Sequence, residues 1–225
     1  MAVVRITYFS DILCIWAYVA QARVDALKAA FGTEVEVDYR FCSVFGDTQT
    51  KIGAGWKGRG EFAGYNRHVR DIAERFSHIQ VQPEVWISSQ PASSASPHLF
   101  LAATQAWERK SGSSETPIFE SVMWAFRRGF FLDGLNIANW DIQCQLARPF
   151  GVDVDAVEEQ VRSGNAFAKL SADYHDAQKT LIEGSPTFVL NDGRQKLYGN
   201  VGFRIIEASV KELLREPHPD QASWC

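Results

Sequence analysis

The first forty residues show three successive patterns of hydrophobic and polar positions. Residues 3–9 form an apolar, β-branched run that predicts a buried strand. Apolar side chains then recur at intervals of three and four over about residues 15–31, which predicts a helix that ends at Gly32. Residues 34–41 alternate strictly between polar and apolar, as expected of a half-buried strand. Strand, helix and strand in this order predict a βαβ unit with a parallel pair of strands.

The middle of the chain has mainly helical periodicity. Residues 46–60 are rich in glycine and polar side chains, and we expect a flexible lid or a linker there. Residues 83–97 contain three prolines and several serines, which predict an irregular connector. The apolar spacing predicts helices over about residues 61–76, 97–110, 117–129, 137–149, 153–162 and 164–181, the last of which could be split.

The β pattern returns near the end of the chain. Residues 187–190 and 195–198 read as two short strands around an Asp-Gly turn, which predicts a β-hairpin. A last helix is expected over about residues 201–215, followed by a loosely ordered tail over residues 217–225. The whole order is therefore β-α-β, a long helical stretch, and β-β-α, which is an α/β fold class.

Composition limits the classes of function. The 225 residues suit one large domain, or one domain with a substantial insertion, and 46% of them are hydrophobic. A net charge of −4 without a basic run argues against nucleic acid as a partner. The sequence shows neither a signal peptide nor 18 consecutive apolar residues, so we expect no membrane association and, by default, a cytoplasmic location.

One cysteine stands out from the others by its position. Cys14 follows the first strand and precedes the first helix, where orphan N–H groups favour a thiolate, so we expect a reactive thiol of depressed pKa. The alternative is a buried cysteine that packs as a small hydrophobic side chain. Asp11 could cap the same helix, or raise the pKa of the thiol by like-charge repulsion. The motif is Cys-x-x-Ala, because Ala17 stands where a dithiol enzyme has its second cysteine.

The remaining cysteines carry no evident chemistry. Cys42, Cys144 and Cys225 match no zinc-ligand spacing, so we expect no metal, and all four thiols are expected to be free in a reducing compartment. Cys42 lies at the end of the second predicted strand, which gives no particular reason for it to reach Cys14.

Two motifs resemble those of a known superfamily. They are Asp11-Ile12-Leu13-Cys14-Ile15-Trp16-Ala17-Tyr18 and Gly184-Ser185-Pro186-Thr187-Phe188-Val189-Leu190. With the predicted topology, they resemble the thioredoxin-like superfamily, in particular the branch with a large α-helical insertion. That branch includes DsbA-like disulfide oxidoreductases, 2-hydroxychromene-2-carboxylate isomerases and kappa-class glutathione transferases.

The resemblance implies a domain organisation and several site residues. It implies a thioredoxin-like domain from residues 1–45 and 182–216, with the helical insertion over residues 46–181. Cys14 matches the nucleophilic cysteine of the oxidoreductases and the reactive serine of the isomerases and transferases. Pro186 matches a cis-proline, and the backbone of the preceding residue, here Ser185, would pair with a bound peptide or with glutathione.

Three further residues, Asp11, Trp16 and Asn200, enter as candidates for substrate or glutathione binding. Trp16 sits where a substrate would pass, although packing explains it equally well. Asn200 lies before the last predicted helix, in a region that glutathione-using relatives place near the γ-glutamyl carboxylate. The alternative is a plain helix cap with Asn200 as the N-cap residue.

Three functions remain open from the sequence. The favoured one is a DsbA-like thiol-disulfide oxidoreductase acting through Cys14 alone, with glutathione as the resolving thiol and cosubstrate and no permanently bound cofactor. The second is a glutathione-dependent isomerase or kappa-like glutathione transferase. The absence of a second cysteine at position 17, which is Ala17, favours this function. The third is a non-catalytic binding module. The partners expected are a small thiol or disulfide substrate and, through the apolar insertion surface, a possible second copy in a homodimer.

Overall fold

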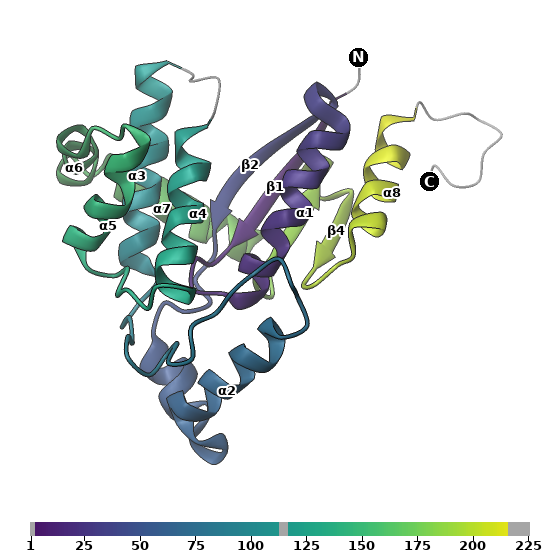
Figure 1. Ribbon diagram of the computed structural model, residues 1–225. Helices are drawn as coiled ribbons and strands as arrows, with labels where there is room; N and C mark the ends of the chain where they lie inside the picture. The colour runs from purple at the N-terminus through teal and green to yellow at the C-terminus, as the bar shows by residue number, and fades with distance from the viewer. Residues whose placement is uncertain (1–2, 113–116, 216–225) are drawn as a thin grey trace.

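The computed structural model describes residues 3–112 and 117–215 and has a four-stranded mixed sheet at its centre (Figure 1). The strand order is β2-β1-β3-β4, in which β1 and β2 are parallel and the other neighbours are antiparallel. The strands are β1 (Val4–Ser10), β2 (Val35–Phe41), β3 (Thr187–Leu190) and β4 (Gln195–Tyr198). The predicted parallel pair and the predicted hairpin are both present, and β3 of the second half pairs with β1 of the first.

Eight α-helices of the described residues surround this sheet. They are α1 (Ile15–Phe31), α2 (Glu61–Ala73), α3 (Ala95–Ser111), α4 (Ile118–Phe131), α5 (Trp140–Ala147), α6 (Val154–Arg162), α7 (Asn165–Lys179) and α8 (Phe203–Leu214). Helix α8 packs on α1 and β1, whereas α7 packs on β2. Helices α3 to α6 form a bundle beyond the β2 edge (Figure 1). Helix α7 is continuous and not split into two. No helix in the described ranges is long and apolar enough to cross a membrane.

Aromatic side chains join the two halves of the sheet. The ring centroid of Tyr8 on β1 lies 5.8 Å from that of Tyr39 on β2 and 4.8 Å from that of Phe188 on β3. All three side chains are buried. The opposite face of the sheet carries a smaller cluster that includes Phe9 and Cys42. Because successive residues of a strand point to opposite faces, Tyr8 and Phe9 anchor one cluster each.

The glycine-rich segment differs from the flexible loop expected from its composition. It forms a π-helical turn (Gln49–Ala54) and a short 3-10 turn (Lys57–Arg59), and it packs closely on α2. A Cβ atom at Gly64 would lie 1.9 Å from the carbonyl oxygen of Arg59, so this close approach requires glycine. The ring centroid of Trp56 lies 5.0 Å from that of Tyr65 on α2, and this contact also holds the segment against the helix. Packing against α2 therefore gives structure to residues whose local sequence favours a loop.

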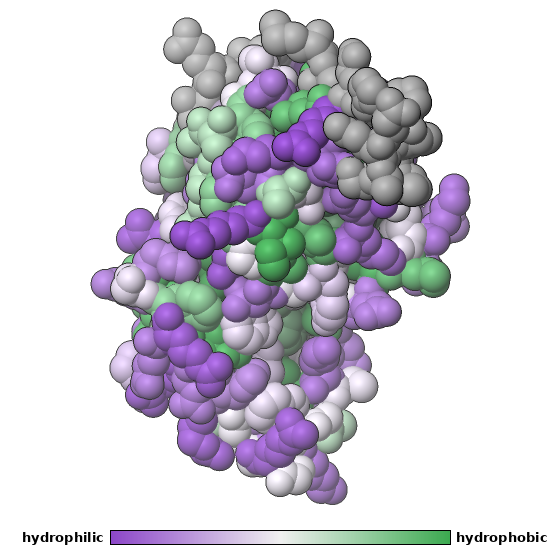
Figure 2. All heavy atoms as spheres, turned by 90° about the vertical axis from the view of Figure 1, so that its right-hand side faces the viewer, coloured by the Kyte–Doolittle hydropathy of each residue, from purple (hydrophilic) through white to green (hydrophobic). Residues whose placement is uncertain are grey.

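The last helix begins later than the sequence indicates. Its N-cap residue is Gly202, so the interpretation of Asn200 as the N-cap is wrong. The expected tail over residues 217–225 lies outside the described residues, as does Cys225. Figure 2 shows the side of the molecule that carries β4 and α8, where hydrophobic residues lie among hydrophilic ones. The exposed large hydrophobic residues of these two elements are Tyr198 and Ile205.

Candidate active site

The Cys14 thiol lies at the junction of the two halves of the fold. Cys14 is the N-cap residue of α1, and its carbonyl oxygen accepts hydrogen bonds from the N–H groups of Ala17 and Tyr18. Its Sγ–H donates to the carbonyl oxygen of Ser185 over 3.2 Å. Only 5% of the residue is exposed, because the cis-proline loop and the helical insertion close around the turn.

The Ser185–Pro186 peptide bond is cis, the geometry that the resemblance implies for this proline. The Ser185 hydroxyl accepts a hydrogen bond of 2.8 Å from the N–H of Asp11, in addition to the carbonyl contact with Cys14. The N–H of Gly199 donates to the carbonyl oxygen of Pro186. The loop is thus held between the active-site turn and the end of β4.

The buried carboxylate of Asp11 organises the turn without capping the helix. Its Oδ1 accepts from the N–H of Leu13 over 3.0 Å, which is a contact within the turn and not with α1. Its Oδ2 accepts from the N–H groups of Val44 and Phe45 and from the hydroxyl of Ser94 over 2.8 to 2.9 Å. The helix-cap interpretation is therefore wrong, and this carboxylate instead ties the turn to the insertion.

A neutral histidine on α3, His98, holds the backbone of the turn in place through a hydrogen bond. His98 on α3 is fully buried, and its Nε2 accepts a hydrogen bond of 3.0 Å from the N–H of Ile12. The proton must then be on Nδ1, which lies 3.0 Å from the hydroxyl of Tyr174. Burial lowers the pKa of His98 to about 4, against the opposing effect of Asp11. The sequence offered no signal for this role, because His98 and Ile12 are 86 residues apart.

The thiol itself differs from the expectation of a depressed pKa. Burial raises the pKa of Cys14, and the charge of Asp11 adds to this effect. Hydrogen bonding from the Ser185 side chain and from the N–H groups of Ala17 and Trp16 lowers the pKa, but by less than burial raises it. The like-charge effect considered for Asp11 is therefore present, and desolvation dominates because the turn is covered.

The other candidate residues contribute less. Trp16 is partly buried, and its ring packs edgewise on Phe76 with 6.1 Å between the centroids. Asn200 is exposed, and the described contacts join it to no other candidate residue. It follows Gly199, whose N–H contacts the cis-proline loop, so the segment lies near the site although its asparagine makes no contact there.

Cys42 and Cys144 are free and buried. Burial, with the charges of Asp11 and Cys14, raises the pKa of Cys42 far above its ordinary value. Cys42 packs with Phe9 in the cluster on the far face of the sheet. A thiol held protonated in this way is a poor nucleophile.

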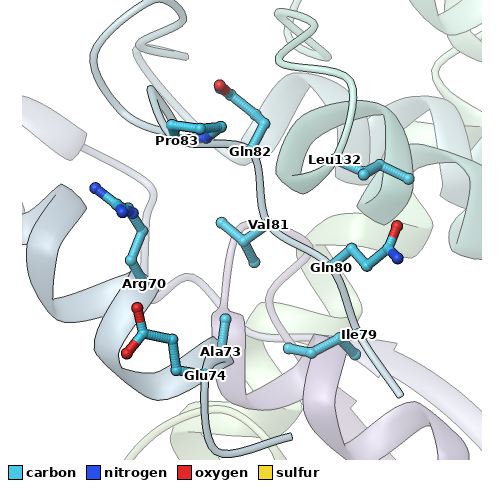
Figure 3. Close-up of a pocket in the computed structure, with 9 residues that line it drawn as sticks. All are labelled: Arg70, Ala73, Glu74, Ile79, Gln80, Val81, Gln82, Pro83 and Leu132. Carbon is cyan, nitrogen blue, oxygen red and sulfur yellow. The ribbon is translucent and has the colours of Figure 1, made fainter. Parts of the chain in front are cut away.

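Two pockets of the described residues lie near neighbours of the Cys14 turn, although no residue of the turn itself lines either of them. One of about 440 Å³ adjoins the cis-proline loop and is lined by Cys42, Ser43, Val44, Lys51, Tyr174, Ala177, Gln178, Ile182, Glu183 and Gly184. The other, of about 560 Å³, lies between α2 and the segment 79–83, and Figure 3 shows Arg70 and Glu74 on its α2 wall. The hydroxyl of Tyr18 donates to the Gln80 carbonyl beside this second pocket, but no cysteine lines it.

Three solved structures share this fold over nearly their whole length. A protein described as a probable DsbA oxidoreductase from Streptomyces coelicolor is 23% identical, with a TM-score of 0.70 and coverage of 96% of this chain and 92% of the other. The cytosolic disulfide reductase DsbM from Pseudomonas aeruginosa is 17% identical, with a TM-score of 0.67 and coverage of 92% and 98%, and it has also been solved with GSH. A 2-hydroxychromene-2-carboxylate isomerase is 17% identical, with a TM-score of 0.63 and coverage of 93% and 95%.

Sequence comparison gives the family directly. No curated protein sequence matches the chain. The sequence model of the DSBA-like thioredoxin domain matches residues 5–211, which include both halves of the sheet, the turn at Cys14 and the cis-proline loop. On this match, and with the thioredoxin-like fold that the structure shows, the chain belongs to the DSBA-like thioredoxin domain family.

Proposed function

We propose that this protein is a glutathione-dependent thiol-disulfide oxidoreductase that acts through Cys14 alone. The observation that carries the proposal is the contact between Cys14 Sγ and the Ser185 carbonyl at the cis-proline loop, with Ala17 in place of a second cysteine. The family to which the chain belongs supports thiol-disulfide chemistry. The solved complex of DsbM with GSH, a protein of the same fold, supports glutathione as the thiol.

The reaction needs two exchange steps. The Cys14 thiolate attacks the glutathione sulfur of a mixed disulfide RS–SG, forms Cys14–S–S–G and releases RS⁻, which takes a proton from water. A second glutathione thiolate then attacks the glutathione sulfur of that adduct, releases GSSG and regenerates the Cys14 thiolate. The net reaction, RSSG + GSH → RSH + GSSG, reduces one disulfide and forms another, so it requires no second protein thiol.

The neighbours of Cys14 either stabilise its thiolate or hold the turn in position. Hydrogen bonding from Ser185, Ala17 and Trp16 favours the thiolate over the thiol. The Asp11 carboxylate opposes the thiolate but holds the turn in place through its own hydrogen bonds. Because an adduct on a crowded thiol must be removed from outside, a small mobile thiol such as glutathione suits the second step.

The internal alternative is poorly supported. Cys42 is a described thiol on which the charge of Cys14 acts, but it packs in the far-face cluster and its pKa is raised mainly by burial. Resolution by Cys42 would require it to leave that cluster and lose its proton. An external thiol avoids both costs.

The raised pKa of Cys14 favours a second candidate function. A protonated Cys14 could donate a hydrogen bond to the thiolate of bound glutathione, as a glutathione-dependent isomerase or transferase would require. The structural likeness to 2-hydroxychromene-2-carboxylate isomerase is compatible with this role. In that case Cys14 would activate a ligand and would form no disulfide.

Steady-state kinetics separate the two functions. We expect the wild type to reduce a glutathionylated peptide with GSH and the Cys14→Ser variant to lose at least about a thousandfold in kcat/KM, because serine cannot form the adduct. The matched control is Cys144→Ser, which removes a thiol on α5 and should leave kcat/KM unchanged. Turnover of hydroxychromene carboxylate or chlorodinitrobenzene, with peptide reduction independent of Cys14, would support the second function and refute the first.

A further inference from the structure

A row of hydrogen bonds joins the pocket of about 440 Å³ to the backbone of the active-site turn. Tyr174 on α7 lines this pocket, and its hydroxyl lies 3.0 Å from Nδ1 of His98. On the other side of the imidazole, Nε2 accepts from the N–H of Ile12 over 3.0 Å. Ile12 precedes Cys14 by two residues. One phenol and one imidazole therefore connect the pocket wall to the turn that carries the thiol.

His98 faces two different groups with the same nitrogen. Besides its contact with Ile12, Nε2 lies 3.8 Å from Asp11 Oδ1. The imidazole stacks on the ring of Phe41, with 4.5 Å between the centroids and 19° between the planes, and this contact holds its orientation. With the proton on Nδ1, the ring accepts from Ile12. With the proton on Nε2, the ring would face the N–H of Ile12 with a second donor and would instead donate to the Asp11 carboxylate.

The hydroxyl of Tyr174 decides between these two tautomers. Burial raises the pKa of Tyr174, although hydrogen bonding with the Ser43 side chain lowers it, so the phenol keeps its proton near neutral pH. That proton can go to the Ser43 hydroxyl, which also lines the pocket, and the phenol oxygen then accepts from the Nδ1–H of His98. The other charged groups that act on His98 are Asp11 in the turn and Arg127 on α4. Neither is bonded to Nδ1 in the described part of the chain, so Tyr174 is the acceptor on that side.

We propose that Tyr174 is a positioning residue of the active-site turn, which keeps the His98 proton on Nδ1 and so reserves Nε2 for the N–H of Ile12. The proposal deepens the proposed function and rests on it for the role of Cys14. Without the phenol oxygen, the Nδ1 proton has no acceptor. A hydrogen bond from Nε2–H to the Asp11 carboxylate then becomes the better arrangement, because hydrogen bonds to charged groups are stronger than neutral ones. The N–H of Ile12 loses its acceptor, and the turn before Cys14 is no longer held at that point.

The first test is NMR spectroscopy of the imidazole nitrogens in ¹⁵N-histidine-labelled protein at neutral pH, with the His98 signals assigned from their loss in His98→Gln. We expect the proton on Nδ1 in the wild type and mainly on Nε2 in Tyr174→Phe. The matched control is Tyr39→Phe, which also removes a buried hydroxyl, but one that donates to Glu120, and it should keep the wild-type tautomer. A proton on Nδ1 in Tyr174→Phe would overturn the proposal. A proton on Nε2 in the wild type would overturn it as well, whether or not the variant folds.

The second test is the pH dependence of Cys14 alkylation by iodoacetamide, followed by mass spectrometry of the Cys14 peptide. A hydrogen bond from Nε2–H offsets part of the Asp11 charge that raises the pKa of Cys14. We therefore expect the midpoint of the profile to move downward in Tyr174→Phe, by up to about one pH unit, and to stay in place in Tyr39→Phe. A switched tautomer with an unmoved midpoint would overturn the positioning role, because the His98 proton would then not affect the site.

The two tests fail separately from the proposed function. Neither measurement uses glutathione, so a wild type that does not reduce the glutathionylated peptide would refute the proposed function and leave the result for Tyr174 standing. An unchanged tautomer in Tyr174→Phe would refute the positioning role and leave peptide reduction through Cys14 standing.

Discussion

The thiol of Cys14 and the carbonyl oxygen of Ser185 lie 3.2 Å apart, although 171 residues separate them in the chain. Cys14 lies between β1 and α1 in the β-α-β part of the fold, and Ser185 lies just before β3, at the start of the β-β-α part. Pairing of β1 with β3 brings them together, so the candidate site exists only when both halves have folded.

Removal of the Ser185 hydroxyl should affect both reactivity and stability. Ser185→Ala loses the side-chain hydrogen bond that lowers the pKa of Cys14, so the pKa should rise and alkylation at pH 7 should slow. It also leaves the buried N–H of Asp11 unpaired, which costs about 1–3 kcal/mol of unfolding free energy. Ser185→Thr retains a hydroxyl and should keep most of both properties. Equal alkylation profiles for Ser185→Ala and the wild type would contradict this role.

Neutralisation of Asp11 should have opposite effects on reactivity and stability. Asp11→Asn removes a negative charge that raises the pKa of Cys14, so the thiol should be alkylated faster at pH 7. The amide cannot accept from all four donors, and the free energy of unfolding should fall by about 2–4 kcal/mol. Asp153→Asn, at the exposed N-cap of α6, is the matched control and should change stability by less than about 0.5 kcal/mol. A variant as stable as the wild type in urea titration would show that the buried carboxylate does not hold the turn.

His98 should make stability depend on pH. Its pKa falls from 6.5 in an unfolded chain to about 4 in the folded protein, so between these values the unfolded state binds more protons. The contribution is fully present above about pH 6.5 and declines as the pH falls towards 4, by about 3 kcal/mol in total. The measurement is the difference in unfolding free energy between the wild type and His98→Gln, whose amide oxygen can still accept from Ile12. We expect that difference to change across this window, and a constant difference would refute the buried neutral histidine.

Local sequence patterns predict most of the secondary structure but not the electrostatics of the site. The strands, the hairpin and helix α1 follow from periodicity within each element, and the two motifs locate Cys14 and Pro186. The pKa of Cys14 could not be predicted from the start of a helix, because it depends on how deeply the insertion buries the turn.

The supporting residues were missed for a related reason. The partners of the Asp11 carboxylate lie up to 83 residues away, and His98 contacts Ile12 across 86 residues. No local pattern identifies contacts of this range. For Asn200 the local pattern predicts a role that the structure does not show. Its local sequence resembles a helix cap, but the N-cap residue is Gly202 and α8 begins at Phe203.

The central claim, that a single thiol carries the chemistry, is tested most directly by peptide mapping after incubation with oxidised glutathione. The protein would carry Cys225→Ser, so that only the three thiols of the described structure can react, with Cys14→Ser added in the control. We predict one glutathione adduct on Cys14, no Cys14–Cys42 disulfide, complete removal of the adduct by added GSH, and no adduct in the control. An adduct on Cys42 or Cys144 with Cys14 unmodified, or a Cys14–Cys42 disulfide, would contradict the single-cysteine mechanism.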